Sequence, residues 1–198
     1  VNVIGSICMK LTLPTGKEEG FVSTKNLSDW QGQQLQDAVR KGKAVRLKNG
    51  IYADVDALAN TMVDIRMIIP GGILCLWSAW SVYSLTTQIP NAYYIAIERT
   101  RKIVLPDYPE FQLVYQSDNL LSIGATRKNV QGYDIPIFDM ERSVCDAIKY
   151  RNKVGIDVMA EILQTYLRRP DKDISRLMDY ASKLRIRKTL NQYLEVWQ

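Results

Sequence analysis

Three polar residues at helical spacing have the chemistry needed to read DNA bases. Gln33, Gln36 and Arg40 fall on one side of a helix that turns about 100° per residue, and Gln34 and Lys41 flank them. In the major groove, a Gln amide can pair with adenine and an Arg guanidinium with guanine, each through two hydrogen bonds. We therefore expect a helix here that presents these side chains outward.

The elements around this polar face must hold it in position. Leu35, Ala38 and Val39 supply an apolar side, so the helix is predicted to pack through them and to end at the following glycine. Residues 43–53 alternate polar and apolar around Asn49-Gly50, which predicts a β-hairpin with a type I′ turn. Basic residues suited to phosphate contacts lie on either side of the helix: Lys25, Lys43, Arg46 and Lys48.

The residues upstream complete a plan that many DNA-binding proteins share. Residues 23–27 predict a short helix and residues 28–30 a turn, and with the next helix and the hairpin they predict a winged helix-turn-helix over residues 1–53. Its first helix is not legible in residues 1–20. The net charge of +4 over residues 21–53 favours a nucleic-acid partner, although a solvated amphipathic helix beside a hairpin gives the same pattern.

A stretch of 31 residues without a charged side chain, Met67 to Ile97, forms the centre of the remaining chain. Its helical part lies between Gly71-Gly72 and Thr86-Thr87, which is shorter than the roughly 20 residues that a membrane span needs. Apolar residues surround nearly the whole helix, so it should be buried. We expect a core helix followed by a buried strand at residues 92–97, and no membrane partner.

The pattern beyond this centre predicts a mixed α/β domain over residues 54–198. A helix over residues 54–69 should stop at Pro70, and strands are predicted at residues 111–115 and 133–138. A proline in the second strand argues for the edge of a small sheet of three or four strands. Four helical segments follow: residues 139–154, 156–167, 174–184 and 186–197. The predicted fold class is α+β, a winged helix-turn-helix followed by a mixed α/β domain with a small sheet and a C-terminal helical layer.

The composition narrows the chemistry that the chain can perform. It contains no histidine, which excludes Ser-His-Asp and Cys-His catalysis and histidine-ligated metal sites. Its three cysteines, Cys8, Cys75 and Cys145, are scattered, so neither a disulfide framework nor a metal site is predicted, and a reducing cytoplasm is the expected location. We expect no cofactor and no catalytic residue.

A group of charged residues near Asp139 allows two interpretations. Asp139, Glu141 and Asp146 could serve a nuclease, but no Glu-x-Lys pair lies on a predicted strand to complete a Mg²⁺ site. Alternatively, Asp139 at a helix start suits the helix dipole, and Arg142 can pair with Asp146 four residues later. The structural interpretation is favoured.

A second group of basic residues follows in the C-terminal helices. Residues 166–198 carry a net charge of +4, whereas residues 54–165 carry −3. The cations form either a solvated face, the favoured interpretation, or a secondary binding patch. They are Arg168, Arg169, Lys172, Arg176, Lys183, Arg185, Arg187 and Lys188.

Four segments, in this order and spacing, carry a family resemblance: residues 49–52 (NGIY), 78–90 (SAWSVYSLTTQIP), 139–146 (DMERSVCD) and 150–155 (YRNKVG). Across residues 21–197 the chain resembles the AbiEi family, the antitoxins of bacterial abortive-infection toxin-antitoxin systems. Where family members read Ser-Ala-Leu-x-x-His-Gly-Leu, this chain has Trp80, Tyr83 and Ser84 in place of the Leu, His and Gly.

The resemblance implies a function in resistance to phage. A winged helix would bind inverted repeats in the operon's own promoter as a repressor, and a C-terminal domain would counteract a nucleotidyltransferase toxin. Double-stranded operator DNA and the toxin are then the expected partners. The base-reading residues named above are predicted from helix geometry, not from the family resemblance. Two alternatives remain: an antitoxin that sequesters the toxin by direct contact, and a carboxylate-dependent nuclease.

Overall fold

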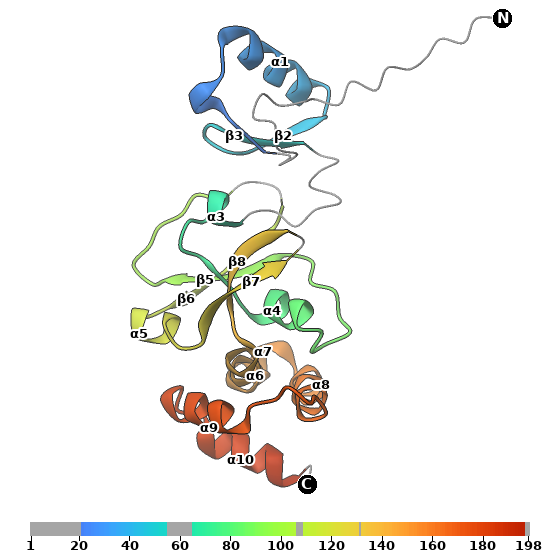
Figure 1. The fold of residues 1–198 in the computed structure, drawn as a ribbon, viewed down its shortest axis with the longest axis vertical. Coiled ribbons are helices and arrows are strands. Elements are labelled where there is room, and N and C mark those ends of the chain that lie inside the picture. Colours follow the sequence, from blue (N-terminus) through green and yellow to red (C-terminus); the bar gives the residue numbers. More distant parts are fainter. Residues whose placement is uncertain (1–20, 55–64, 106–108, 131, 197–198) are drawn as a thin grey trace, which may run out of the picture. The chain divides into compact units, whose positions relative to one another are not determined.

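The computed structural model describes residues 21–54, 65–105, 109–130 and 132–196. The chain divides into two compact units, residues 1–61 and residues 62–198, each with a sheet and a core of its own (Figure 1). Both units combine helices with strands, which confirms the mixed α/β composition predicted from the sequence.

In its described part, residues 21–54, the first unit is a three-stranded antiparallel sheet with one helix packed against it. Its elements are β1 (Phe21–Ser23), the 3₁₀ turn η1 (Thr24–Asn26), α1 (Asp29–Arg40), β2 (Ala44–Lys48) and β3 (Ile51–Asp54). The strand order is β1-β3-β2, so the second strand of the hairpin is central. Its small core contains Val22, Leu35, Ala38, Ala44 and Tyr52.

α1 is longer than the sequence pattern predicted. It begins at Asp29 instead of Gln33, because Ser28 caps the helix and the predicted turn becomes its first helical turn. The short helix expected at residues 23–27 is instead a strand end followed by a single 3₁₀ turn. The helix ends as predicted before Gly42, which has a φ of 67°.

The hairpin of β2 and β3 is confirmed, but its turn is not type I′. That turn needs positive φ at both central residues. Gly50 has a φ of 77°, whereas Asn49 is not among the described residues with positive φ. A register shift between Arg46 and Lys48 accompanies the turn, as in hairpins that combine one left-handed glycine with a bulge.

The second unit is built on a five-stranded mixed sheet in the order β6-β5-β4-β8-β7. The strands are β4 (Ile73–Leu74), β5 (Tyr93–Glu98), β6 (Phe111–Gln116), β7 (Ala125–Val130) and β8 (Tyr133–Phe138). β5 pairs parallel with β6 and β4 with β8, whereas the β4–β5 and β7–β8 pairs are antiparallel. β5, β6 and β8 confirm the predicted strands, while β4 and β7 were not predicted and make the sheet larger than expected.

β8 lies inside the sheet, so the edge position predicted from Pro136 is wrong. Asp139 N donates to Gly124 O at 2.7 Å on the β7 side. Because successive N–H groups of a strand point to opposite sides, the nitrogen of Pro136 faces away from β7. The neighbour on that side, β4, is only two residues long and pairs at Leu74 and Ile137. The missing N–H of Pro136 therefore costs the sheet little.

Both faces of this sheet are covered by apolar side chains. On one face lies α3 (Ile65–Ile68). Its residues Ile65 and Ile68 are fully buried, as is Ile69, which follows the helix. α3 is the described end of the helix predicted over residues 54–69; residues 55–64 lie outside the described part, and Asp54 ends β3 instead of opening that helix. The other face, including Ala96 and Phe138, belongs to a large core shared with the helices.

The other described helices of the second unit are α4 (Leu76–Val82), α5 (Asp118–Leu121), α6 (Met140–Lys149), α7 (Arg151–Val154), α8 (Ile156–Leu167), α9 (Ile174–Lys183) and α10 (Arg187–Val196). All except α5 fall within predicted helical segments, and the helix predicted over residues 139–154 is divided into α6 and α7. α4 is buried as expected: Trp80 is fully enclosed and its Nε1 donates to Ser143 O at 2.9 Å. Cys75 and Cys145 are core residues, while Cys8 lies outside the described part. None of the described helices combines the length and apolar character that a bilayer crossing requires.

Candidate nucleic-acid interface

α1 positions the residues predicted to read bases, and local interactions fix both of its ends. At the start, Ser28 and Gln31 form a capping box: Ser28 N donates to Gln31 Oε1 at 2.9 Å, and Gln31 N donates to Ser28 Oγ at 3.4 Å. At the end, Lys41 is the C-cap and Gly42 turns the chain into the hairpin. The direction of the helix is therefore set before any ligand binds.

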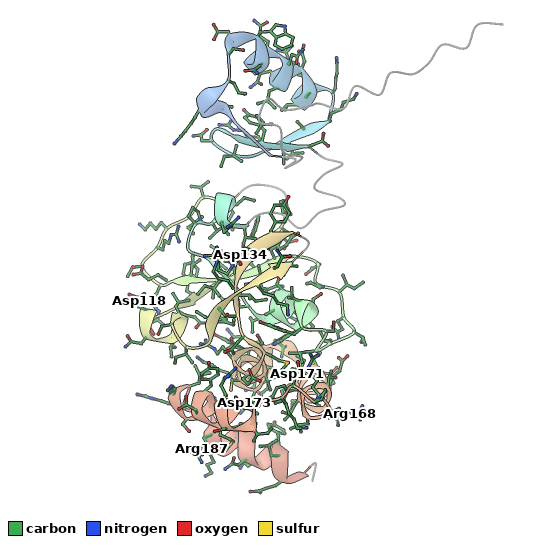
Figure 2. The ribbon with its side chains drawn as sticks, in the orientation of Figure 1. Asp118, Asp134, Arg168, Asp171, Asp173 and Arg187 are labelled. Atoms are coloured by element: carbon green, nitrogen blue, oxygen red, sulfur yellow. The ribbon has the colours of Figure 1, made fainter. Side chains whose placement is uncertain are left out.

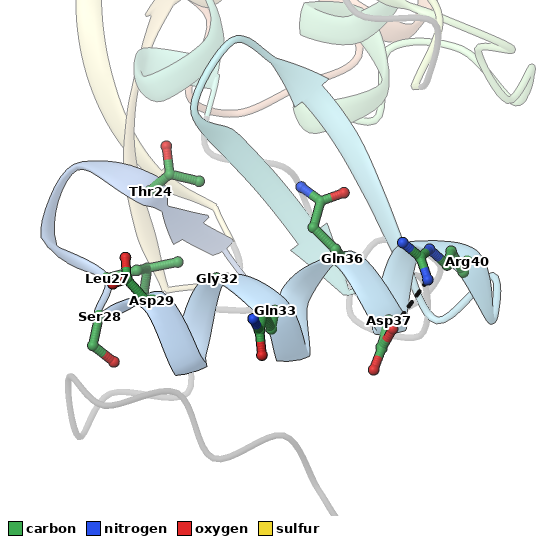
Figure 3. A pocket seen from close by; sticks show the side chains of 9 residues that line it. All are labelled: Thr24, Leu27, Ser28, Asp29, Gly32, Gln33, Gln36, Asp37 and Arg40. Carbon is green, nitrogen blue, oxygen red and sulfur yellow. Dashed lines mark ion pairs between the residues drawn. The ribbon is translucent and has the colours of Figure 1, made fainter.

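The outward face of α1 is polar, as predicted. The exposed residues of the predicted interface on this helix and at its C-cap are Gln33, Gln34, Gln36, Arg40 and Lys41. An open groove of about 860 Å³ runs along this face (Figure 3). Its lining includes the amides of Gln33 and Gln36 and the guanidinium of Arg40, together with the carboxylates of Asp29 and Asp37; Thr24, Leu27, Ser28 and Gly32 complete it.

Two of these side chains already have partners within the unit. Gln36 Nε2 donates to the Tyr52 hydroxyl at 3.5 Å, which turns this amide toward the sheet (Figure 3). Arg40 Nη1 lies 3.7 Å from Asp37 Oδ1, and the two side chains are 81% and 61% exposed. Such an exposed pair contributes little and separates readily, so Arg40 stays available to a ligand. Gln33 forms no hydrogen bond within the described residues and is the freest of the predicted base readers.

The cations predicted to hold phosphates lie on the surface around α1. Lys25 and Lys43 are exposed, and Arg46 is exposed on β2. Arg46 Nη2 donates to Asn49 Oδ1 across the hairpin turn. The predicted contact Lys48 belongs to β2, but its side chain lies outside the described part of the structure. The unit thus joins an amide-rich helix face to a hairpin with cationic side chains.

Trp30 is a surface residue that the sequence pattern missed. The sequence pattern predicts a turn at Trp30, but the residue lies in the first turn of α1 and is 65% exposed. The spacing Ser28-x-x-Gln31 is a capping-box signature, so it could have placed the helix start at Asp29. Trp30 then precedes Gln33 by three residues and joins the outer face.

The second predicted basic patch, in the C-terminal helices, is interrupted by acids. Three of its members form ion pairs: Arg169 with Asp171 (2.8 Å), Arg176 with Asp173 (3.3 Å) and Lys183 with Asp179 (2.7 Å). The remaining cations of the patch form no ion pair within the described residues: Arg168, Lys172, Arg185, Arg187 and Lys188. Arg168 is the C-cap residue of α8, whereas Arg187 is the first residue of α10 (Figure 2). This arrangement favours a solvated face over one continuous patch.

The charged residues near Asp139 serve the fold. Asp139 caps α6, and its Oδ1 accepts a hydrogen bond from Arg142 N at 2.8 Å. Arg142 is completely buried and its Nε lies 3.1 Å from Asp146 Oδ1. The same guanidinium donates to Gln116 Oε1 at 2.8 Å, to Leu120 O of α5 and to Ile123 O in the turn after it. The predicted cap and the predicted ion pair are both confirmed.

The remaining carboxylate of this group is also engaged. Glu141 is 3% exposed, and its Oε1 accepts from the Tyr166 hydroxyl and from Asp173 N, each at 3.2 Å. Burial raises the pKa of Asp139, although the hydrogen bonds from Arg142 N and the Tyr180 hydroxyl oppose the shift. These contacts describe a helix junction, with the acids used as caps and acceptors.

The end of α4 explains part of the sequence pattern at residues 78–85. Tyr83 is the C-cap, and Ser84 has a φ of 53°. Leu85 N donates to Trp80 O at 2.8 Å and Ser84 N donates to Ser81 O at 3.0 Å, which is a Schellman motif. Lys128 Nζ lies 4.8 Å from the centre of the Tyr83 ring, and burial raises the pKa of Tyr83 to about 12.

Comparison with known proteins gives no family model that matches this chain and no curated protein that matches it. The function is therefore inferred from the residues described above.

Proposed function

We propose that this protein is an antitoxin of the AbiEi type that binds its own operator DNA through the first unit and represses its operon. The observation that carries the proposal is α1, a capped helix with exposed amides and a guanidinium that leads directly into a hairpin with exposed cations. In winged helix-turn-helix proteins the second helix of the motif enters the major groove. We assign this role to α1 because it lies directly before the hairpin; among the described residues, a strand and a 3₁₀ turn precede it.

The exposed residues divide into two roles. Gln33, Gln34 and Arg40 read base edges, where each good bidentate contact discriminates against a wrong base by about 1–3 kcal/mol. Gln36 joins them if DNA replaces its hydrogen bond to Tyr52. The residues that hold phosphates are Lys25, Lys41, Lys43, Arg46 and Lys48.

For the second unit we propose the antitoxin role, directed against a nucleotidyltransferase. Two features of the fold support the family resemblance behind it. The glycine that family members carry coincides with Ser84, where φ is 53° and glycine is favoured. The segment at residues 139–146 supplies the cap and the buried ion pair of α6. Within this role, the alternative is that the protein sequesters the toxin by direct contact. Co-purification with the neighbouring gene product distinguishes sequestration from counteraction without a stable complex.

Fluorescence anisotropy with the DNA upstream of the gene tests the DNA-binding role. Arg40→Ala should reduce the preference for this DNA over an unrelated duplex. Arg46→Ala should weaken binding to both duplexes equally and reduce the salt dependence by about one phosphate contact. Arg168→Ala, which removes an exposed charge from the second unit, is the matched control. Equal binding of both duplexes by the wild-type protein, or unchanged binding by both interface variants, would overturn the proposal.

A further inference from the structure

The two edges of the five-stranded sheet are protected to different degrees. At one edge, β7 exposes residues 125–129 and carries Arg127 and Lys128, and charged side chains on an edge strand oppose pairing with another chain. At the other edge, β6 has the sequence FQLVYQ, without a charge, a proline or a glycine. β6 therefore lacks the usual protection of an edge strand.

The backbone of β6 presents a regular row of hydrogen-bonding groups on its outer side. Tyr93 N donates to Glu110 O at 2.8 Å and Arg99 N to Gln116 O at 2.9 Å, so the even-numbered residues of β6 face β5. In a parallel pair, alternate residues direct both N–H and C=O to the opposite side. The outward groups are those of Phe111, Leu113 and Tyr115, which have no backbone partner on that side within the described part of the chain.

The side chains of these three residues lie on one face of the sheet. Phe111, Leu113 and Tyr115 pair in register with Tyr93, Ile95 and Ile97, so each shares a face with its partner. The Phe111 ring stacks on the Tyr93 ring at a centroid distance of 5.5 Å. Tyr115 is left 48% exposed, which is high for an aromatic residue in a strand.

We propose that β6 pairs antiparallel with β6 of a second copy of this chain, so that two sheets join into one across a two-fold axis. Only the odd-numbered residues offer outward hydrogen bonds, so they must oppose one another. The register that pairs all three outward residues places the axis at Leu113, with Phe111 opposite Tyr115 of the second copy. Such aromatic cross-strand pairs are stabilising, and no charge opposes a like charge along the strand.

The partner we propose for β6 is β6 of a second copy, because these six residues are complementary to themselves in an antiparallel pair. An uncharged, self-complementary strand gives an isologous contact that closes after two copies. This contact uses only the second unit and is independent of the DNA binding proposed above.

Light scattering coupled to size exclusion, on the full chain at high micromolar concentration, tests the pairing. The wild-type protein should be a dimer and Tyr115→Lys a monomer with unchanged circular dichroism and melting temperature. Thr126→Lys, which adds the same charge to the exposed β7 edge, should leave the dimer intact. A wild-type monomer, or a dimer that Tyr115→Lys does not dissociate, would overturn the proposal.

Cysteine cross-linking tests the register. Opposed residues of a hydrogen-bonded antiparallel pair have Cα atoms about 5.5 Å apart, within the range of a disulfide. In a Cys8→Ser background, Leu113→Cys should link two copies under mild oxidation, because Cys75 and Cys145 are buried. Val114→Cys, whose residue packs against the core on the other face, should not link. Linking by Val114→Cys alone, or by neither variant, would overturn the register.

Discussion

α1 and α6 are both capped amphipathic helices, but the polar residues of α1 are exposed and those of α6 are buried. α1 is capped by Ser28 and leaves its glutamines and Arg40 exposed, whereas α6 is capped by Asp139 and buries Glu141 and Arg142. The difference comes from what surrounds each helix. α1 packs on one small sheet, while α6 is contacted by α4, α8, α9 and α10. Charged residues at helical spacing thus remain free for a partner in one unit and stabilise the fold in the other.

In α6, the buried Arg142 depends on hydrogen bonds from its guanidinium, of which the structure shows four. Arg142 has a rigid set of five N–H donors, and a buried charge is tolerated only when its hydrogen bonds are made. Its partners are Asp146 Oδ1, Gln116 Oε1, Leu120 O and Ile123 O. The Phe138 ring lies beneath, with its centre 4.2 Å from the guanidinium carbon. Removing the cation should therefore leave several polar groups without partners.

Arg142→Leu should produce the largest loss of stability, about 3–5 kcal/mol, because it leaves Asp146 as an uncompensated buried charge. Urea denaturation followed by circular dichroism measures the free energy of unfolding. The double variant Arg142→Leu/Asp146→Leu should recover part of the loss, because both charges are then removed. A loss below about 1 kcal/mol in the single variant would mean that the charges of α6 contribute as little to stability as the exposed pair on α1.

Gly124→Ala should be the next most harmful change. Gly124 has a φ of 70°, and an added Cβ would lie 2.5 Å from Arg142 Cβ and 3.0 Å from Asp139 Oδ1. Overpacking at a filled site costs about 1–3 kcal/mol. Gly132→Ala is the matched control, since Gly132 also has positive φ, 89°, but no described atom lies within 4 Å of its added Cβ. The same urea experiment should show a clearly larger loss for Gly124→Ala; equal losses would argue against tight packing around Arg142.

The contacts of α6 between residues close in sequence could be predicted from the sequence, whereas its contacts between distant residues could not. The Asp139 cap and the Arg142–Asp146 pair each involve residues three or four positions apart. The bond from Arg142 to Gln116 joins positions 26 residues apart on a helix and a strand, which no periodicity reveals. β7 escaped prediction for a similar reason, because none of residues 125–129 is buried to give an alternating pattern.

The candidate interface shows the same limit. Helical periodicity correctly predicted that Gln33 and Arg40 would be exposed and that Leu35 would be buried. It could not predict that Gln36 bonds to Tyr52, since that contact requires the hairpin to fold back on α1. Trp30 was misplaced because Ser28 favours both turns and helix caps.

Replacing Ser84, an exposed polar residue in the second unit, should increase stability, unlike the substitutions in α1 and α6. Ser84 lies at the left-handed position of the Schellman motif, where a side chain costs energy and makes no described contact that repays it. Ser84→Gly should therefore stabilise the protein by about 0.5–1 kcal/mol, measured as a rise in melting temperature. Ser81→Gly, inside α4, is the control and should destabilise by about 0.5 kcal/mol. Destabilisation by Ser84→Gly would show that the hydroxyl group has a role of its own.

The smallest effect on stability should come from α1, together with the largest effect on binding. Gln33→Ala removes an exposed side chain without a described partner, so the free energy of unfolding should change by less than about 0.5 kcal/mol. Discrimination between operator and unrelated DNA should fall by about 1–3 kcal/mol, or about 5- to 150-fold in the ratio of dissociation constants. Gln192→Ala, an exposed glutamine on α10, should change neither quantity. If Gln33→Ala lowers stability and leaves discrimination intact, the polar face of α1 belongs to the fold, as that of α6 does.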